Sequence, residues 1–226
     1  MEKQQAEKVR KKPGGKLFYM MGKSAAGKDT LYREILKRRP VLKTCILYTT
    51  RPPREGEQDG ITYHFTNKEE LAAFEQQGKL IEQRVYETAH GPWIYATVDD
   101  GQLNLHNGCF LMQGTLESFC MLRSYFGADA VIPLYIETDD LTRIRRAIER
   151  EGCEKKPDIA EVCRRFLADN SDFSEDKLQA AGIEKRYCND NMEDCLHEIL
   201  QEIDRFLCGS THETITGERK SSHGRI

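Results

Sequence analysis

The feature that most constrains this chain is a glycine- and lysine-containing stretch, Gly22-Lys23-Ser24-Ala25-Ala26-Gly27-Lys28-Asp29-Thr30. A predicted buried strand at residues 16–21, with an apolar run at residues 17–21, precedes it, and a helical pattern at residues 28–39 follows. The two glycines allow backbone angles that a Cβ forbids, so consecutive N–H groups can turn inward around an anion. The lysine adds charge, and the start of the helix adds unpaired donors. The stretch therefore predicts a loop that binds nucleotide phosphates.

The last part of this loop departs from the usual G-x-x-x-x-G-K-[ST] pattern. Asp29 stands where Ser or Thr is expected, and Thr30 follows one place later. Asp29 either binds Mg²⁺ through its carboxylate, since hard cations favour oxygen ligands, or caps the helix while Thr30 supplies the hydroxyl. The sequence leaves both alternatives open, so the metal ligand is expected to be Asp29 or Thr30.

Short β-type runs alternate with helical patterns along the rest of the chain, which favours a doubly wound α/β fold with a mainly parallel sheet. Further strands are expected at residues 44–50, 108–113 and 131–137, and helices at residues 68–77, 140–151, 158–170 and 192–207. Residues 51–100 interrupt this rhythm with turns, aromatic residues and short extended runs, and are predicted to be an inserted substrate subdomain. The Arg/Glu-rich segment at residues 141–173 is predicted to be a second, mobile insert.

The two ends of the chain are expected to lie outside the fold. Residues 1–15 form a predicted disordered basic arm, and residues 208–226 a flexible polar tail. Overall, 34 Lys+Arg nearly balance 37 Asp+Glu, so a nucleic-acid partner is not expected and any anion site must be local.

Membrane and extracellular classes are also disfavoured. The apolar runs are far shorter than the ~18 residues that suggest a membrane span, and no signal-peptide pattern precedes them. The eight cysteines show no Cys-x-x-Cys spacing, so neither a zinc site nor a disulfide framework is supported. A cytoplasmic location without a membrane partner is therefore expected.

A second motif follows the phosphate loop, because residues 48–65 read YTTRPPREGEQDGITYHF. Together the two motifs resemble the guanylate kinase family, whose hallmark is T-T-R-x-x-R-x-G-E-x-x-G-x-x-Y-x-F. The match falls on Thr49, Thr50, Arg51, Arg54, Gly56, Glu57, Gly60, Tyr63 and Phe65.

The resemblance covers roughly residues 17–207 and implies the P-loop NTPase three-layer α/β fold. It divides a guanylate kinase-like domain at residues 16–207 into three parts. The nucleotide core would comprise residues 16–48, 101–140 and 171–207, the small mixed β-sheet subdomain for GMP residues 49–100, and the helical lid residues 141–170.

The resemblance also implies roles for acceptor-site residues. Arg51, Arg54 and Tyr63 would hold the acceptor phosphate, since two guanidinium groups and a hydroxyl can all donate to its oxygens. Glu82 would read guanine by accepting hydrogen bonds from N1–H and the exocyclic amine. If one residue is inserted relative to the family pattern at residues 90–97, Tyr95 would contact the phosphate and Thr97 the base.

The donor site is expected to involve the lid and the last core loop. Arginines with helical spacing form two predicted clusters, Arg143, Arg146 and Arg150, then Arg164 and Arg165. Family lids use such arginines to cover the polyphosphate, and Arg150 and Arg165 are the leading candidates; the alternative is a solvent-facing helix balanced by glutamates. Asn189 resembles the loop that lines the donor adenine.

The chain also departs from the family pattern. Family members carry I-L-D-I-D-x-Q-G after the third core strand, whereas residues 109–117 read CFLMQGTLE and lack both aspartates. Leu47 stands where the family has a serine that contacts the acceptor. One hypothesis is that Asp29 restores the missing negative charge near the metal.

The expected reaction transfers a phosphoryl group from ATP, with Mg²⁺, to GMP or dGMP. The acceptor phosphate is already largely ionised, so positioning and charge neutralisation by Lys28, Mg²⁺ and lid arginines should dominate over general-base catalysis. One alternative is the ribose 1,5-bisphosphate phosphokinases, which share G-K-D and lack the acidic pair, but generally lack T-T-R-x-x-R. Another is a non-catalytic interaction module, which generally has an eroded phosphate loop. The oligomeric state stays open.

Overall fold

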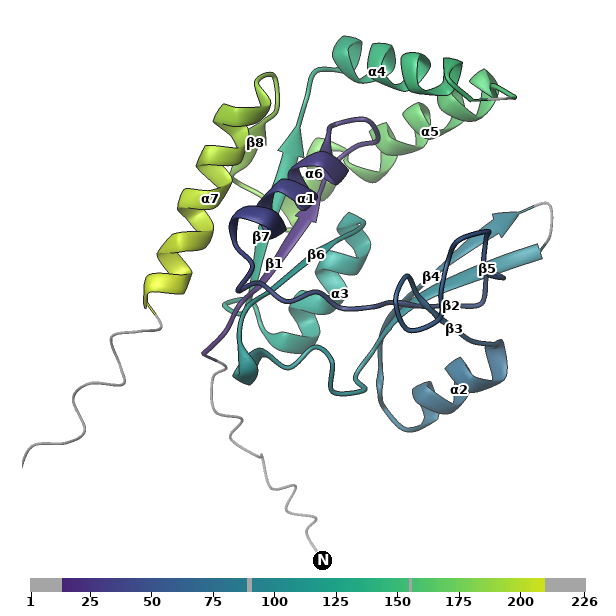
Figure 1. Cartoon of the computed structure of the whole chain (residues 1–226), viewed down its shortest axis with the longest axis vertical. Coiled ribbons are helices and arrows are strands. Elements are labelled where there is room, and N and C mark those ends of the chain that lie inside the picture. Colours follow the sequence, from purple (N-terminus) through teal and green to yellow (C-terminus); the bar gives the residue numbers. More distant parts are fainter. Residues whose placement is uncertain (1–13, 89–90, 155, 210–226) are drawn as a thin grey trace, which may run out of the picture.

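The computed structural model describes residues 14–88, 91–154 and 156–209. Its elements are β1 (Leu17–Met21), α1 (Lys28–Arg38), β2 (Tyr48–Thr49), β3 (His64–Phe65), α2 (Lys68–Gln76), β4 (Leu80–Thr88), β5 (Gly91–Val98), the 3₁₀ turn η1 (Leu105–Asn107), β6 (Phe110–Gln113), α3 (Leu116–Phe126), β7 (Val131–Glu137), α4 (Asp140–Gly152), α5 (Ile159–Asp172), α6 (Glu175–Ala180), β8 (Arg186–Cys188) and α7 (Met192–Gly209). Figure 1 shows α4 and α5 as a pair at the top of the view, and the small sheet with α2 on the right.

The core sheet has the strand order β6-β1-β7-β8, and all its neighbours are parallel. Every residue of β1 is buried, as expected for a parallel strand covered on both faces. Tyr19 and its i±2 neighbours pack on the α3 side, whereas Phe18 and Met20 pack against α1 and α7. The sheet thus lies between two helical layers, which confirms the predicted three-layer α/β fold.

The strand order places three loops at one edge of this sheet. Because β1 lies between β6 and β7, the residues that follow these strands, Gly22, Gly114 and Thr138, meet at their carboxyl ends. In open α/β sheets, ligands bind in the crevice at such a switch point. The core therefore presents the phosphate loop at the edge where a ligand is expected.

The small sheet has the order β3-β2-β5-β4. Strands β2 and β3 are parallel, and the other pairs are antiparallel, so this sheet is mixed as predicted. Side chains alternate along a strand, and three cross-strand pairs therefore share one face of the β4–β5 hairpin: Glu82 with Thr97, Arg84 with Tyr95, and Tyr86 with Trp93.

Two expectations about the elements were wrong. Of the core strand expected at residues 44–50, only Tyr48–Thr49 forms a strand, and it joins the small sheet. The extended runs in residues 51–100 were expected to be short, but two of them, β4 and β5, span nine and eight residues.

Helix α3 was missed entirely. Its N-cap Thr115 accepts a hydrogen bond from the Ser118 N–H, and its buried face includes Leu116, Phe119 and Leu122. Most of the expected basic arm and tail lies outside the described residues. Within the part of the chain that the structure describes, no helix is long and apolar enough to cross a membrane.

Candidate active site

The phosphate loop joins β1 to α1 through backbone conformations that explain its glycines. Gly27 has φ +90°, and a Cβ there would lie 2.3 Å from Asn189 Nδ2. A Cβ on Gly22 would lie 2.3 Å from the Ile136 carbonyl oxygen. Ala25, at φ +61°, is the one non-glycine residue with positive φ among those described, and such strain clusters at ligand-binding loops. The loop therefore has the tight shape that a phosphate cradle requires.

The side chain of Lys28 folds back over this loop. Its Nζ donates to the carbonyl oxygens of Gly22 at 2.7 Å and Lys23 at 2.8 Å. Burial lowers the pKa of Lys28 to about 8, although Asp169 and Asp29 favour the charged form. The predicted phosphate-binding cation thus lies within the loop and loses its proton more readily than an exposed lysine.

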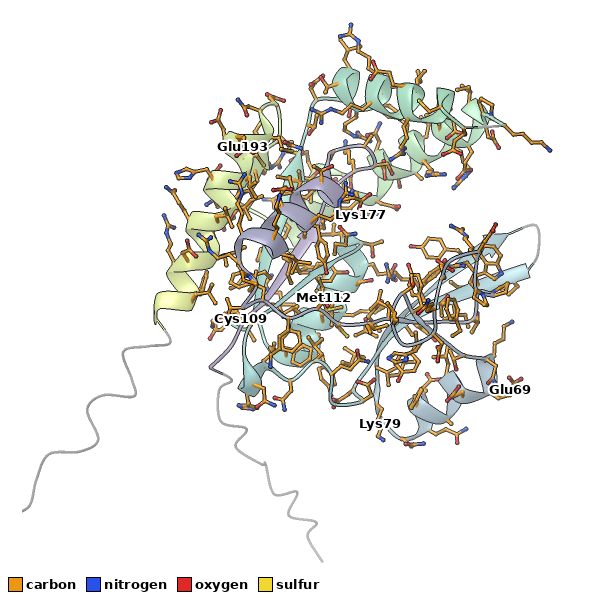
Figure 2. All side chains as sticks on the ribbon, in the orientation of Figure 1. Glu69, Lys79, Cys109, Met112, Lys177 and Glu193 are labelled. Carbon is orange, nitrogen blue, oxygen red and sulfur yellow. The ribbon has the colours of Figure 1, made fainter. Side chains whose placement is uncertain are left out.

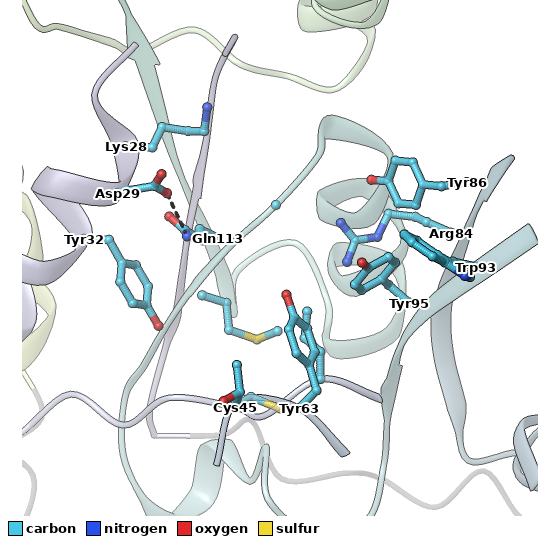
Figure 3. Close-up of a pocket in the computed structure, with 14 residues that line it drawn as sticks. Lys28, Asp29, Tyr32, Cys45, Tyr63, Arg84, Tyr86, Trp93, Tyr95 and Gln113 are labelled. Atoms are coloured by element: carbon cyan, nitrogen blue, oxygen red, sulfur yellow. Dashed lines mark hydrogen bonds between the residues drawn. The ribbon is translucent and has the colours of Figure 1, made fainter. Parts of the chain in front are cut away.

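Asp29 faces a cavity rather than capping α1. The N-cap of α1 is Gly27, and no side chain caps this helix, so the capping alternative for Asp29 was wrong. The Asp29 carboxylate accepts a hydrogen bond from Gln113 Nε2 at 3.1 Å and lines the cavity (Figure 3). Gln113 Oε1 is buried without a hydrogen-bond partner in the described structure. Thr30 is exposed.

A cavity of about 580 Å³ separates the phosphate loop from the small sheet, a volume typical of small-molecule sites. Figure 3 shows the small-sheet side chains Arg84, Tyr86, Trp93 and Tyr95 on one side. Across from them lie Lys28, Asp29, Tyr32 and Gln113. Apolar side chains complete the lining, including Leu47 and Met112, and Figure 2 shows Met112 near the centre of the molecule. We call this space the acceptor cavity, after the predicted acceptor-site residues Tyr63 and Tyr95 that line it.

Four residues are predicted to contact the acceptor phosphate, and only the two tyrosines among them line the cavity. Tyr63 and Tyr95 line the cavity, but Arg51 is 3% exposed and lies behind them. Its Nε donates to Tyr95 Oη at 3.1 Å, and its two terminal nitrogens donate to Glu57 at 2.9 and 2.8 Å. The Arg54 side chain is exposed. Whether Arg51 and Arg54 hold the acceptor phosphate stays a prediction.

Glu57 explains this arrangement of the two arginines. Its carboxylate pairs with the Arg51 guanidinium and also accepts the Arg54 backbone N–H at 2.7 Å. The hydrogen bonds from Arg51 and the Arg54 backbone lower the pKa of Glu57 to about 2. The sequence motif therefore includes its own internal counter-ion, a pairing that the sequence analysis missed.

The two residues predicted to contact the guanine base, Glu82 and Thr97, form a hydrogen bond with each other and do not line the cavity. Glu82 Oε1 accepts from Thr97 Oγ1 at 2.7 Å, and Oε2 accepts from Ser118 Oγ at 2.9 Å. Neither Glu82 nor Thr97 lines the acceptor cavity. Their contacts with the base stay predictions. Arg84, which the sequence analysis did not single out, lies beside Glu82 and lines the cavity; the alternation of residues 82, 84 and 86 along a strand could have revealed it.

Helices α4 and α5, which form the predicted lid, are joined to the phosphate loop by a buried ion pair. Arg143, 1% exposed, donates to Asp169 at 3.0 Å and to the Ser24 carbonyl at 3.0 Å. Asp169 also accepts the Ser24 N–H at 2.7 Å. The predicted lid residues Arg150 and Arg165 line a small hollow next to Ser24. Both are therefore near the loop, and Asp169 is an anchor that the sequence analysis missed.

Asn189 lies beneath the loop. Its Nδ2 donates to the Ala26 carbonyl at 2.7 Å, and the residue is 3% exposed. Its Oδ1 is buried without a partner in the described structure. The observed contact braces the phosphate loop, and the contact with adenine stays a prediction.

The family model, the sequence relatives and a solved structure to which this chain is similar are all described as guanylate kinase. The family model described as guanylate kinase matches residues 14–203. A guanylate kinase of Salinibacter ruber is 27% identical over 197 residues, covering 86% of this chain and 98% of the relative. One of Desulfitobacterium hafniense is 43% identical over 68 residues, covering 30% and 34%. The crystal structure of guanylate kinase from Anaplasma phagocytophilum shares the fold, with a TM-score of 0.54 at 14% identity and 88% coverage of both chains.

Proposed function

The chain belongs to the guanylate kinase family, and from this premise we propose that it transfers the γ-phosphoryl group of ATP to GMP, giving ADP and GDP. The observation that carries the proposal is the acceptor cavity, which adjoins a phosphate loop at the carboxyl edge of the core sheet. Because dGMP has the same base and phosphate, we propose it as a second acceptor.

The residues of this chain promote the transfer by positioning the donor and acceptor phosphates and by neutralising their negative charge. The loop N–H groups and Lys28 bind the donor phosphates, and an oxygen of the acceptor phosphate attacks the γ-phosphorus in line. Tyr95 accepts a hydrogen bond from Arg51, so its own hydroxyl proton is free to donate to the acceptor phosphate beside Tyr63. An acceptor phosphate is largely ionised, so the site needs no strong general base.

We propose that residues 49–100 act as the acceptor subdomain and residues 141–170 as a lid. Arg150 lies close enough to Lys28 to lower its pKa, as a minor cause, which supports a position over the donor phosphates. Arg165 lines the same small hollow beside Ser24 as Arg150 does. Closure of the lid would exclude water and bring both guanidinium groups to the transferring phosphoryl group. For Asn189, the contact with Ala26 supports a bracing role.

Mg²⁺ supplies charge neutralisation to the phosphates when it is bound. The oxygen donors present suit it, because the Asp29 carboxylate lines the acceptor cavity beside the Gln113 amide, whose Nε2 donates to it and whose Oε1 has no partner in the described structure. We propose Asp29 as the main protein ligand, with Gln113 beside it. Within the described residues no three His, Cys, Asp or Glu side chains gather as a metal site. Mg²⁺ commonly needs only one or two carboxylates.

We also propose that the protein works in the cytoplasm. Its cysteines are scattered without paired spacing. Cys109 and Cys195 pack in the core as small apolar side chains.

The test is transfer from ATP by the purified chain, with GMP, dGMP, AMP, UMP and ribose 1,5-bisphosphate as separate acceptors. We expect GDP and dGDP, and loss of most activity in Lys28→Ala. Lys37→Ala is the matched control, because Lys37 is on the same helix and its side chain is 76% exposed. Transfer to ribose 1,5-bisphosphate alone would show that the chain is a sugar-phosphate kinase. Absence of any ATP turnover would favour an interaction module.

A further inference from the structure

Two neighbouring residues near the end of α5 hold the phosphate loop. Asp169 Oδ2 accepts the Ser24 N–H at 2.7 Å, and its Oδ1 accepts the Ser24 hydroxyl at 3.3 Å. Lys23 Nζ donates to Asn170 Oδ1 at 2.8 Å. Figure 1 shows α5 passing beside the loop that precedes α1. A donor nucleotide therefore meets a loop that already has a carboxylate on one of its N–H groups.

Four positively charged side chains surround this carboxylate. Arg143 Nη2 donates to Asp169 Oδ2 at 3.0 Å. Among the charges around Lys28, Asp169 is the one that most raises the pKa of this lysine, so the carboxylate lies near its ammonium group. Arg150 and Arg165 line the same small hollow as Asp169. A loop N–H together with several cations is the environment that a phosphate group takes in proteins.

The surroundings indicate which phosphate this carboxylate resembles. The lysine of such a loop reaches the β- and γ-phosphates. Ser24, Lys28 and Asp169 all line a second cavity of about 1300 Å³, and Tyr86 of the small sheet lines both this space and the acceptor cavity. Asp169 thus lies on the side of the loop that faces the acceptor. The donor phosphate on that side is the terminal one, because it is the one transferred.

We propose that Asp169 is a specificity-determining residue for the donor, because its carboxylate takes the place of a γ-phosphate that only a triphosphate can use to displace it. This inference rests on the proposed function and specifies how donor is distinguished from product. The Ser24 N–H has one hydrogen and serves one strong acceptor at a time. A γ-phosphate beside the carboxylate would also bring two negative charges together, which is unfavourable. ADP ends at the β-phosphate, so the contact of Asp169 with Ser24 persists when ADP binds.

The displacement couples the donor to the predicted lid. Asp169 belongs to α5, and its ion pair with Arg143 joins α5 to α4. When a γ-phosphate takes the Ser24 N–H, Asp169 moves away, and α5 is released to bring Arg165 to the transferring phosphoryl group. After transfer this group is on the acceptor, and Asp169 returns to Ser24 while ADP is still bound.

Calorimetry without an acceptor tests the inference, with the non-hydrolysable ATP analogue AMP-PNP and with ADP as ligands. Asp169→Asn keeps an oxygen for the Ser24 N–H but removes the charge. We expect this variant to bind AMP-PNP about 10-fold more tightly than the unmodified protein does, with its affinity for ADP unchanged. Asp172→Asn is the matched control, because Asp172 is on the same helix and its side chain is 67% exposed. It should change neither affinity.

Three results would overturn the inference. Weaker binding of AMP-PNP to Asp169→Asn would show that the carboxylate only supports the shape of the loop. Equal tightening of AMP-PNP and ADP would show that it repels all phosphates alike, and unchanged affinity for both would show that it opposes neither. A loss of folding in the variant cannot produce the expected result, because that result is a selective gain in affinity.

Hydrogen exchange of the unmodified protein gives a test that needs no substitution. Peptides covering residues 159–172 should exchange faster with AMP-PNP bound than with ADP bound, because α5 loses its contact with Ser24 only in the first case. Equal or slower exchange with AMP-PNP would contradict the displacement.

The outcomes separate this inference from the proposed function. If both nucleotides bind the unmodified protein but Asp169→Asn gains no selectivity, only the role of Asp169 is refuted. If neither nucleotide binds, the proposed function fails, and the inference fails with it.

Discussion

Replacing Arg143 by Met is expected to loosen helices α4 and α5 from the phosphate loop. The change keeps much of the side-chain length but removes a guanidinium that donates to Asp169, Asp140 and the Ser24 carbonyl at 3.0, 2.6 and 3.0 Å. It also removes a cation–π contact at 4.9 Å from the Phe166 ring. The remaining carboxylate of Asp169 would keep two donors, the Ser24 N–H at 2.7 Å and the Ser24 hydroxyl at 3.3 Å.

The magnitude follows from how far each partner is buried. Removing one member of a buried ion pair costs about 3–5 kcal/mol, because the other charge is left uncompensated. The Asp169 side chain is 14% exposed and that of Asp140 is 54% exposed, so solvent relieves part of this loss. We therefore expect the free energy of unfolding to fall by about 2–3 kcal/mol. For a chain of this size, that corresponds to a decrease in Tm of about 4–12 °C.

Urea unfolding followed by circular dichroism measures this change, and Arg164→Met provides the contrast. Arg164 donates to Glu161 at 2.6 and 2.8 Å, distances that are shorter than the 3.0 Å from Arg143 to Asp169, but its side chain is 66% exposed. Such a surface pair contributes less than about 1 kcal/mol. Burial, and not bond length, should therefore decide the ranking. Equal effects of the two substitutions would refute this reasoning.

Three other outcomes are expected. The affinity for ATP should fall as pH rises above about 8, because the pKa of Lys28 is lowered to about 8 and its charged form binds phosphate; calorimetry giving a flat profile from neutral to alkaline pH would exclude this. Asp29→Ser should raise the Mg²⁺ concentration needed for half-maximal turnover, and an unchanged Mg²⁺ titration would remove Asp29 as a ligand. Gly114→Ala should destabilise the fold by about 1–3 kcal/mol, because its Cβ would lie 2.2 Å from the buried Tyr19 hydroxyl; thermal unfolding of Gly152→Ala, which has open space, is the comparison.

Much of the fold could be predicted because local pattern and burial agree. Residues 131–137 were expected as a strand and form β7 with the same bounds, since an apolar run between turns fits a fully buried parallel strand. The expected core strand at residues 44–50 failed because pairing with β5 and β3 draws Tyr48–Thr49 into the other sheet. Such a choice between two sheets depends on distant partners, which a local pattern does not contain.

The candidate site was harder to predict for the same reason. The phosphate loop is contiguous, so its composition alone indicated its chemistry. The acceptor cavity instead joins side chains through strand register, and only the pairing of β4 with β5 places Arg84 beside Tyr95. Similarly, the motif showed Arg51 as a basic residue but gave no sign that Glu57 would hold its guanidinium. Charge pairing and side-chain orientation are properties of the folded chain.

The position of Trp93 has a practical consequence. The protein has a single tryptophan, and it lines the acceptor cavity. All of the intrinsic indole fluorescence therefore originates where the nucleoside monophosphate is proposed to bind. Stacking of a purine on or near this ring would quench the emission, so occupancy could be titrated without a label and without turnover.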